Sequence, residues 1–96
     1  MENKITQKLK SHYREIKDRF KVKEIGMFGS HVKGRARKRS DIDVLVEFEK
    51  GYKTFDNYME LKFFLEDLFN NKVDLVLKSA LKEELKPYIL SEVVYA

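Results

Sequence analysis

The chain has 96 residues, 43% of them hydrophobic and 38% charged, and 20 Lys and Arg against 16 Asp and Glu give a formal net charge of +4 at pH 7. A chain of this length cannot bury two separate cores, so we expect residues 1–96 to form a single domain. The hydrophobic share excludes a disordered chain. Cysteine is absent, which excludes a disulfide framework, a thiolate zinc site and a cysteine nucleophile.

The sequence carries no mark of a membrane or secreted protein. Its apolar runs stay well short of the roughly 20 residues that a membrane-spanning helix needs. The stretch from Met1 to Ile5 lacks the apolar core of a signal peptide, so we expect a cytoplasmic location and no membrane partner. The two histidines, His12 and His31, are too few for a histidine metal cage. Any metal is therefore expected to take oxygen ligands, which favours hard cations such as Mg²⁺.

The N-terminal part of the chain predicts a helix, a strand and a basic loop. Residues 3–20 predict one amphipathic helix, because apolar side chains recur every three or four positions, at Ile5, Leu9, Tyr13, Ile16 and Phe20. Residues 23–28 predict a short strand that runs straight into a Gly-Ser pair. A brief helix is expected from residue 31, followed by a loop after Gly34 that contains four basic residues, Arg35, Arg37, Lys38 and Arg39.

The middle of the chain predicts two strands on either side of a helix. Residues 41–48 predict a strand with one apolar face, made by Ile42, Val44, Val46 and Phe48. Thr54 is placed to cap a helix over residues 55–69, whose inner side is Tyr58, Leu61, Leu65 and Leu68. A turn at residues 70–71 leads into a third strand over residues 73–77, which is rich in β-favouring side chains.

The C-terminal part predicts a final helix. Ser79 is expected to cap a helix from residue 80, and Pro87 to interrupt or kink it. The apolar tail, residues 88–96, is expected to pack against the rest of the chain. The alternation of helices and strands predicts an α/β or α+β sandwich, with helices covering one face of a small sheet. The pattern leaves open whether the strands run parallel or mixed.

Two carboxylates in the second predicted strand point to metal chemistry. Asp41 and Asp43 are two positions apart, so their side chains face the same way with Cα atoms about 6.5–7 Å apart. Carboxylates this close raise each other's pKa unless a cation neutralises them. Their apolar neighbours argue against a merely solvated face. A divalent metal is the simplest explanation, and this spacing suits two metals about 3.5–4 Å apart.

A phosphate-binding element is predicted beside these acids. Gly29 lets the backbone approach a ligand closely, and Ser30 supplies a hydroxyl next to the N–H groups at the start of a short helix. Lys33 and the basic loop add positive charge. Asp74 is a lone acid in the third predicted strand, where Asp is disfavoured. If that strand neighbours the second, Asp74 can complete the metal site or accept a proton from an attacking hydroxyl.

These residues resemble a known family. A Gly-Ser pair, ten further residues and then Asp41-Ile42-Asp43 resemble the signature of the DNA polymerase β nucleotidyltransferase superfamily. The chain length, Ser40 before the acids and Val73-Asp74-Leu75-Val76 near the end are similar to the minimal nucleotidyltransferase domains. These domains are commonly the antitoxin partners of HEPN-domain ribonuclease toxins. The resemblance spans nearly the whole chain and implies a polymerase-β-like fold, with a small mixed sheet and helices packed on one face.

The resemblance also implies roles for individual residues. Asp41 and Asp43 would bind two Mg²⁺ ions, and Asp74 would be the third catalytic and metal-binding carboxylate, placed to activate the acceptor hydroxyl. The nucleotide triphosphate would be held by Gly29, Ser30, Lys33 and, as an auxiliary contact, Ser40. The implied reaction is transfer of AMP from ATP to a hydroxyl, in the antitoxin subfamily a tyrosine of the HEPN-domain toxin. The chain departs from its relatives at Lys33, where Arg is common, and a lysine cannot make a bidentate phosphate contact.

Two other functions compete with this one. The chain could be a non-catalytic antitoxin that neutralises its partner by contact alone, with the acids serving structure. It could also bind nucleic acid through its basic loop and first helix, but a net charge of +4 with scattered aromatics makes nucleic acid the weakest candidate for a direct partner. His31 follows the Gly-Ser pair and is expected to be an ordinary turn residue rather than a catalyst.

Overall fold

The protein's structure, a computed structural model, describes residues 4–34 and 40–96. Within these ranges the elements follow one another as α1 (Lys4–Ser11), α2 (Tyr13–Phe20), β1 (Val22–Phe28), α3 (Ser30–Lys33), β2 (Ile42–Phe48), α4 (Phe55–Phe69), β3 (Val73–Leu77), the 3₁₀ turn η1 (Lys78–Ala80), α5 (Lys86–Glu92) and β4 (Val94–Tyr95). The predicted basic loop, with Arg35, Arg37, Lys38 and Arg39, lies outside the described residues.

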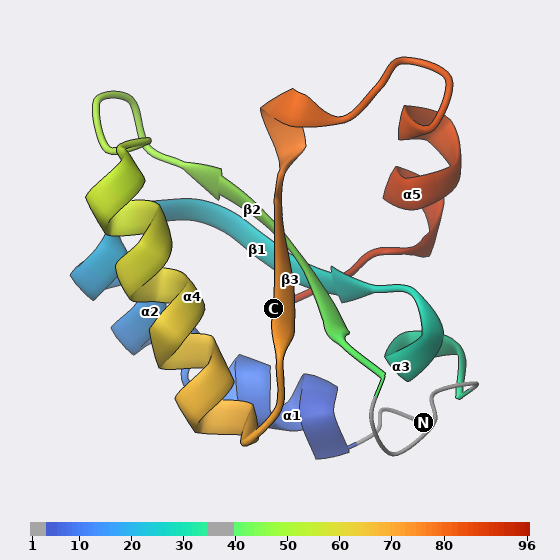
Figure 1. Cartoon of the computed structure of the whole chain (residues 1–96), viewed down its shortest axis with the longest axis horizontal. Coiled ribbons are helices and arrows are strands. Elements are labelled where there is room, and N and C mark those ends of the chain that lie inside the picture. The colour runs from blue at the N-terminus through green and yellow to red at the C-terminus, as the bar shows by residue number, and fades with distance from the viewer. Residues whose placement is uncertain (1–3, 35–39) are drawn as a thin grey trace.

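The strands form one mixed sheet in the order β3-β2-β1-β4 (Figure 1). β1 and β2 pair antiparallel, and so do β1 and β4, whereas β2 and β3 run parallel. The connection from β1 to β2 contains α3, and the crossover from β2 to β3 contains α4. This arrangement confirms the predicted α/β fold and decides in favour of a mixed sheet.

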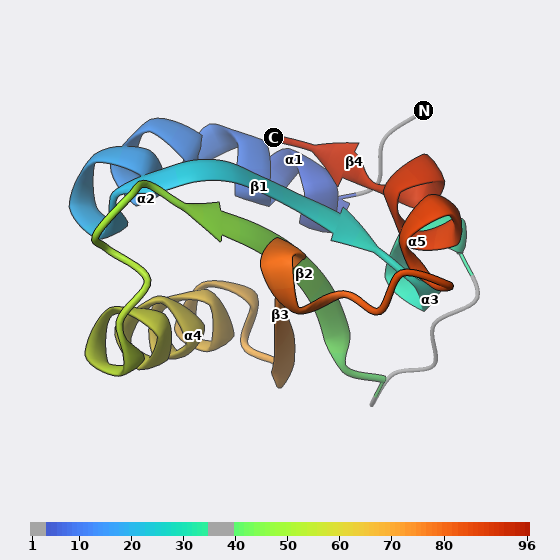
Figure 2. The ribbon, with the colours of Figure 1, turned by 90° about the horizontal axis from the view of Figure 1, so that it is seen from above.

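The core lies between one face of the sheet and α1, α2 and α4. These three helices lie on the same side of the sheet, while α3 and α5 both lie toward the far end of the molecule, apart in Figure 1 and overlapping in Figure 2. The helices contribute Leu9, Ile16, Phe20, Leu61 and Leu65, all buried against alternate residues of the strands. Among residues 4–34 and 40–96, no helix combines the length and apolar character needed to traverse a lipid bilayer.

The single N-terminal helix predicted over residues 3–20 is wrong in one respect, because the structure divides it at His12. The Ser11 hydroxyl donates to the Lys8 carbonyl oxygen at 2.8 Å, and the Nδ1 atom of His12 lies 2.9 Å from the same oxygen. These side chains compete with the helical hydrogen-bond ladder. The apolar spacing continues across the break, so Ile16 and Phe20 still face the core.

The predicted helix over residues 55–69 and the predicted strand over residues 73–77 are confirmed to the residue. Thr54 caps α4 by accepting a hydrogen bond from the Asn57 N–H at 3.2 Å. Asn70 ends the helix in the left-handed conformation, with φ +50°. Strong local signals at both ends of this helix made its boundaries predictable.

Side chains of α4 also hydrogen bond to the backbone of β3, the outer strand of the sheet. The Tyr58 hydroxyl donates to the Leu75 carbonyl oxygen at 2.5 Å, and the Val73 N–H donates to the Glu66 carboxylate at 3.0 Å. Unpaired backbone groups at a sheet edge invite association with other strands. These two contacts cover part of that edge and fix β3 relative to α4.

The C-terminal region corrects two predictions. Ser79 lies within η1 rather than capping a long helix, and α5 begins only at Lys86. Pro87 stands in the first turn of α5, where its missing N–H costs nothing, so it starts this helix instead of kinking it. The tail then adds the short strand β4, which the sequence pattern did not predict. Within the tail Tyr88 is exposed, whereas Ala96 packs against the core.

Candidate active site

Strand register brings the predicted carboxylates together at one end of the sheet. The parallel pairing of β2 with β3 places Asp43 directly opposite Asp74. Neighbouring strands lie about 4.8 Å apart, so two side chains on the same face at paired positions are close neighbours. On its other side Asp43 pairs with Phe28, the last residue of β1. Gly29 follows immediately, so the Gly-Ser pair meets the acids at the same place.

The carboxylates impose an electrostatic cost on one another. Asp43 is half-buried, and this burial raises its pKa, with further increases from the nearby carboxylates of Asp74 and Asp41. Positive charge on His31 acts in the opposite direction. Asp41 and Asp74 are themselves exposed. The site thus concentrates negative charge that a divalent cation would relieve.

Gly29 is required by both backbone geometry and space. Its φ of +80° and ψ of −157° belong to a region that only glycine enters readily. A Cβ atom added at this position would overlap the carboxylate of Asp43. Glycine therefore lets the turn between β1 and α3 run against the acid, which places the start of α3 beside the carboxylates.

The single turn α3 carries the predicted phosphate-binding residues. Ser30 begins it, and backbone N–H groups at the start of a helical turn have no acceptor within the helix. Lys33 ends it, and Gly34 closes it with φ +72°. The Lys33 ammonium forms an ion pair of 2.5 Å with Glu92 of α5. Nothing in the local sequence predicts that contact.

His31 has a larger part in this region than its sequence position suggests. Its Nε2 atom lies 2.9 Å from the carbonyl oxygen of Ser40, so α3 is tied to the segment that precedes Asp41. Its charge also acts on Asp43. The prediction of an ordinary turn residue missed this part, and the only signal in the sequence is the place of His31 directly after the Gly-Ser pair.

The donor set fits a metal that shares its ligands with a bound phosphate. In residues 4–34 and 40–96, no group of three acidic or histidine side chains is arranged so that it could hold a metal ion by itself. Mg²⁺ does not need one, since it commonly binds to proteins through one or two carboxylates, with substrate phosphates and water completing its shell. Asp41, Asp43 and Asp74 are hard oxygen donors beside a turn suited to phosphate.

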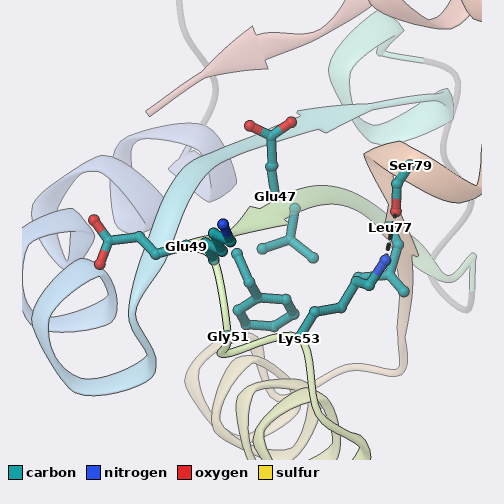
Figure 3. A pocket seen from close by; sticks show the side chains of 9 residues that line it. Glu47, Glu49, Gly51, Lys53, Leu77 and Ser79 are labelled. Carbon is teal, nitrogen blue, oxygen red and sulfur yellow. Dashed lines mark hydrogen bonds between the residues drawn. The ribbon is translucent and has the colours of Figure 1, made fainter.

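A separate cavity of about 300 Å³ lies at the opposite end of β2 (Figure 3). It is lined by the last residues of β2, by the turn at Gly51, and by Lys53, Leu77 and Ser79. Its side chains include the hydrogen-bonded pair Lys53 and Ser79, 3.5 Å apart. None of the three carboxylates and no part of the Gly-Ser turn belongs to it. We therefore place the candidate active site at the carboxylates rather than in this cavity.

Sequence comparison identifies relatives over most of the chain. The model of the nucleotidyltransferase domain family matches residues 9–96. The protein adenylyltransferase MntA of Thermococcus cleftensis is 46% identical over 87 residues, which cover 91% of this chain and 87% of that protein. A Methanocaldococcus jannaschii protein, provisionally named a protein adenylyltransferase, is 40% identical over 88 residues, or 91% of this chain and 85% of the relative.

Comparison with solved structures gives the same result. A protein provisionally described as a minimal nucleotidyltransferase superposes with a TM-score of 0.76 at 32% identity, covering 93% of both chains. A toxin–antitoxin structure with AMP-PNP gives a TM-score of 0.71 at 22% identity, covering 88% of this chain and 69% of the other. A Shewanella oneidensis complex of a tri-AMPylated HEPN toxin with an MNT antitoxin gives a TM-score of 0.67 at 21% identity, covering 95% of this chain and 70% of the other. The last two likenesses show a shared fold.

Proposed function

This chain belongs to the nucleotidyltransferase domain family and is an adenylyl-transferring enzyme, and we propose that it transfers AMP from ATP to a hydroxyl of a partner protein. The observation that carries the proposal is the register of β2 and β3, which sets Asp43 against Asp74 beside the Gly-Ser turn. Phosphoryl and nucleotidyl transfer depend on positioning and on neutralising charge, and this arrangement suits both.

In the proposed reaction all three carboxylates would bind metal, and Asp74 would have a second part. Asp41 and Asp43 would hold the divalent metal, for which we propose two Mg²⁺ ions, and Asp74 would be the third ligand. When bound, such ions neutralise the charge of the phosphates and make the α-phosphorus more electrophilic. Asp74, which is exposed, would accept the proton of the acceptor hydroxyl. The hydroxyl oxygen then bonds to the α-phosphorus, the bond to the bridging oxygen breaks, and pyrophosphate leaves.

The turn that follows β1 would hold the triphosphate. The backbone at Gly29 and Ser30 can approach phosphate oxygens without a side chain in the way, and Lys33 would add a positive charge. Ser40 lies near through its carbonyl contact with His31 and would be an auxiliary contact. Backbone groups that bind phosphates do not distinguish one base from another, so the proposal of ATP as the donor rests on the similarity to a protein adenylyltransferase.

We propose a HEPN-domain toxin as the acceptor protein. The Shewanella relative of known structure was solved with a tri-AMPylated HEPN toxin, and the Thermococcus relative is named a protein adenylyltransferase. The carboxylates of this chain are open to solvent on one side, with Asp41 and Asp74 exposed. An acceptor hydroxyl on a second protein can therefore reach the site. In this role the chain is an antitoxin that modifies and neutralises its partner in the cytoplasm.

The proposal is tested by incubating the chain with its cognate HEPN protein, Mg²⁺ and ATP labelled in the α-phosphate. The partner should gain label with the wild-type chain, lose almost all of it with Asp41→Asn, and keep it with Asp67→Asn, an exposed acid of α4. Absence of label with the wild type would contradict catalysis. Toxin neutralisation at wild-type strength by an Asp41→Asn/Asp43→Asn variant would show that contact alone suffices.

A further inference from the structure

An ion pair links the proposed phosphate-binding turn to the C-terminal helix. The Lys33 Nζ and Glu92 Oε1 atoms lie 2.5 Å apart, with side-chain exposures of 43% and 31%. Neither α3 nor α5 contains a fully buried residue, although Val32 of α3 is partly buried against the core. Both elements lie toward the same end of the molecule, apart in Figure 1 and overlapping in Figure 2. The ion pair joins the last residue of α3 to the last residue of α5.

Residues 93–96, which follow Glu92, are held against β1 and so limit the positions that the Glu92 carboxylate can occupy. A Cβ atom on Gly26 would approach Val93 Cγ1 to 2.5 Å, so Val93 packs directly on the centre of the sheet. The next residues pair with β1 as β4, and the Ala96 N–H donates to the Ile25 carbonyl oxygen at 2.9 Å. Glu92 stands at the junction between this anchored strand and α5, which has no buried residue. It can release Lys33 without moving β4.

We propose that Glu92 competes with the nucleotide triphosphate for Lys33, so that nucleotide binding displaces α5 from α3. This inference rests on the proposed function, because it needs a triphosphate at the Gly-Ser turn. A lysine ammonium offers three donors and no acceptor, and two anions at one ammonium repel each other. The carboxylates of Asp41, Asp43 and Asp74 already make this end of the sheet negative. One more carboxylate at Lys33 lowers nucleotide affinity further.

The opposite effect would follow if Glu92 only oriented Lys33 toward the phosphates. Removing the carboxylate would then weaken nucleotide binding, because the lysine side chain would lose its preferred geometry. The two roles differ in sign, so a binding measurement separates them. Glu83 provides a matched control, since it is an acid of the same C-terminal segment and pairs with Lys86 rather than with α3.

The test is the Kd of a non-hydrolysable ATP analogue with Mg²⁺, measured by calorimetry on the full chain. Glu92→Gln should tighten binding about two- to fivefold, the range of a partly exposed ion pair. Glu83→Gln should leave the Kd unchanged. In a Lys33→Met background, Glu92→Gln should have no effect. An unchanged or weaker Kd for Glu92→Gln, or equal tightening in the Lys33→Met background, would overturn the inference.

Amide hydrogen exchange of the wild-type chain gives a second, variant-free measurement. Exchange in residues 86–92 should quicken when the analogue binds, whereas protection of β1 should not fall. Unchanged exchange in α5 upon binding would contradict the displacement. A wild-type chain that binds no analogue would defeat the proposed function along with this inference, whereas binding without the Glu92 effect would defeat this inference alone.

Discussion

The two faces of β2 differ in what they contribute. Ile42, Val44 and Val46 on one face are at most 1% exposed and form the core with the helices. On the other face Asp43 is half-buried beside other carboxylates, and its pKa is raised. Consecutive residues of one strand thus have different roles, because their side chains alternate between the two faces of the sheet. The face with Ile42, Val44 and Val46 stabilises the fold, whereas on the other face, which also carries the buried Leu45, Asp43 brings charge repulsion that a metal and a nucleotide would relieve.

The largest effect expected from this contrast is at Asp43. Asp43→Asn should lower AMP transfer roughly 10³-fold or more, the scale of losing one member of a catalytic group that acts as a unit. The same substitution should raise the metal-free Tm by a few degrees, because the ionised carboxylate is disfavoured in the folded state. Glu47→Gln, on the same face of β2, should leave transfer unchanged. Loss of both activity and stability in Asp43→Asn would contradict the contrast.

The same repulsion predicts a pH dependence. Because the pKa of Asp43 is higher in the folded than in the unfolded chain, the folded state gains stability as the pH falls through that raised pKa. In EDTA, the stability difference between Asp43→Asn and the wild type should be largest near pH 7. It should close in acid, where Asp43 is protonated in both states. A difference that is constant over this range would show that charge is not its cause.

Substitutions in the core should have the opposite effect to Asp43→Asn: they should lower stability and leave the active site intact. Leu61 of α4 is fully buried, so Leu61→Ala should lower the free energy of unfolding by about 2–5 kcal/mol. Phe63, two positions away and 58% exposed, provides the control. Phe63→Ala should change the free energy of unfolding by less than about 0.5 kcal/mol. Urea titration measures both. Equal losses of unfolding free energy in the two variants would show that Leu61 and Phe63 do not differ in burial as the structure indicates.

A substitution at Gly29 tests the contact between Asp43 of β2 and the phosphate-binding turn. Gly29→Ala should cost about 1–3 kcal/mol from its backbone conformation, with an added loss of metal and nucleotide binding from the overlap with Asp43. Gly51 has a similar φ of +89° but open space around it, so Gly51→Ala should show the backbone cost alone. Thermal unfolding and nucleotide titration separate the two. Normal nucleotide binding by Gly29→Ala would contradict the assigned site.

The smallest effect is expected at the sheet edge. Tyr58→Phe removes the hydrogen bond to the Leu75 carbonyl oxygen and should cost about 0.5–1.5 kcal/mol of unfolding free energy. Tyr52→Phe, at an exposed position before α4, should cost nothing measurable. Equal unfolding free energies for wild type and Tyr58→Phe would show that this contact does not hold β3.

Local signals made much of the fold predictable. Thr54 and Asn70 mark the ends of α4, and the alternation of apolar and polar residues in β2 correctly predicts its core face. The break at His12 was missed because hydrogen bonds of Ser11 and His12 to one carbonyl leave the apolar period intact. The strand β4 was missed because two residues carry no pattern and exist as a strand only through pairing with β1.

The site was predictable in composition but not in arrangement. The spacing of Gly29, Asp41 and Asp43 indicated metal and phosphate chemistry. Two carboxylates this close repel each other unless a cation neutralises them, and glycine lets the backbone approach a phosphate. The pairing of Asp43 with Asp74 depends on the register of a parallel pair, which no local pattern specifies. The ion pair between Lys33 and Glu92 depends likewise on tertiary structure, since it joins α3 to α5, which lies far along the chain.

The most direct test of the carboxylate site is a crystal structure of the chain soaked with Mg²⁺ and a non-hydrolysable ATP analogue. The account predicts metal density in contact with Asp41 and Asp43, and a triphosphate lying along the backbone of Gly29 and Ser30. A nucleotide bound in the cavity beside Lys53 and Ser79, with no metal at the carboxylates, would contradict it.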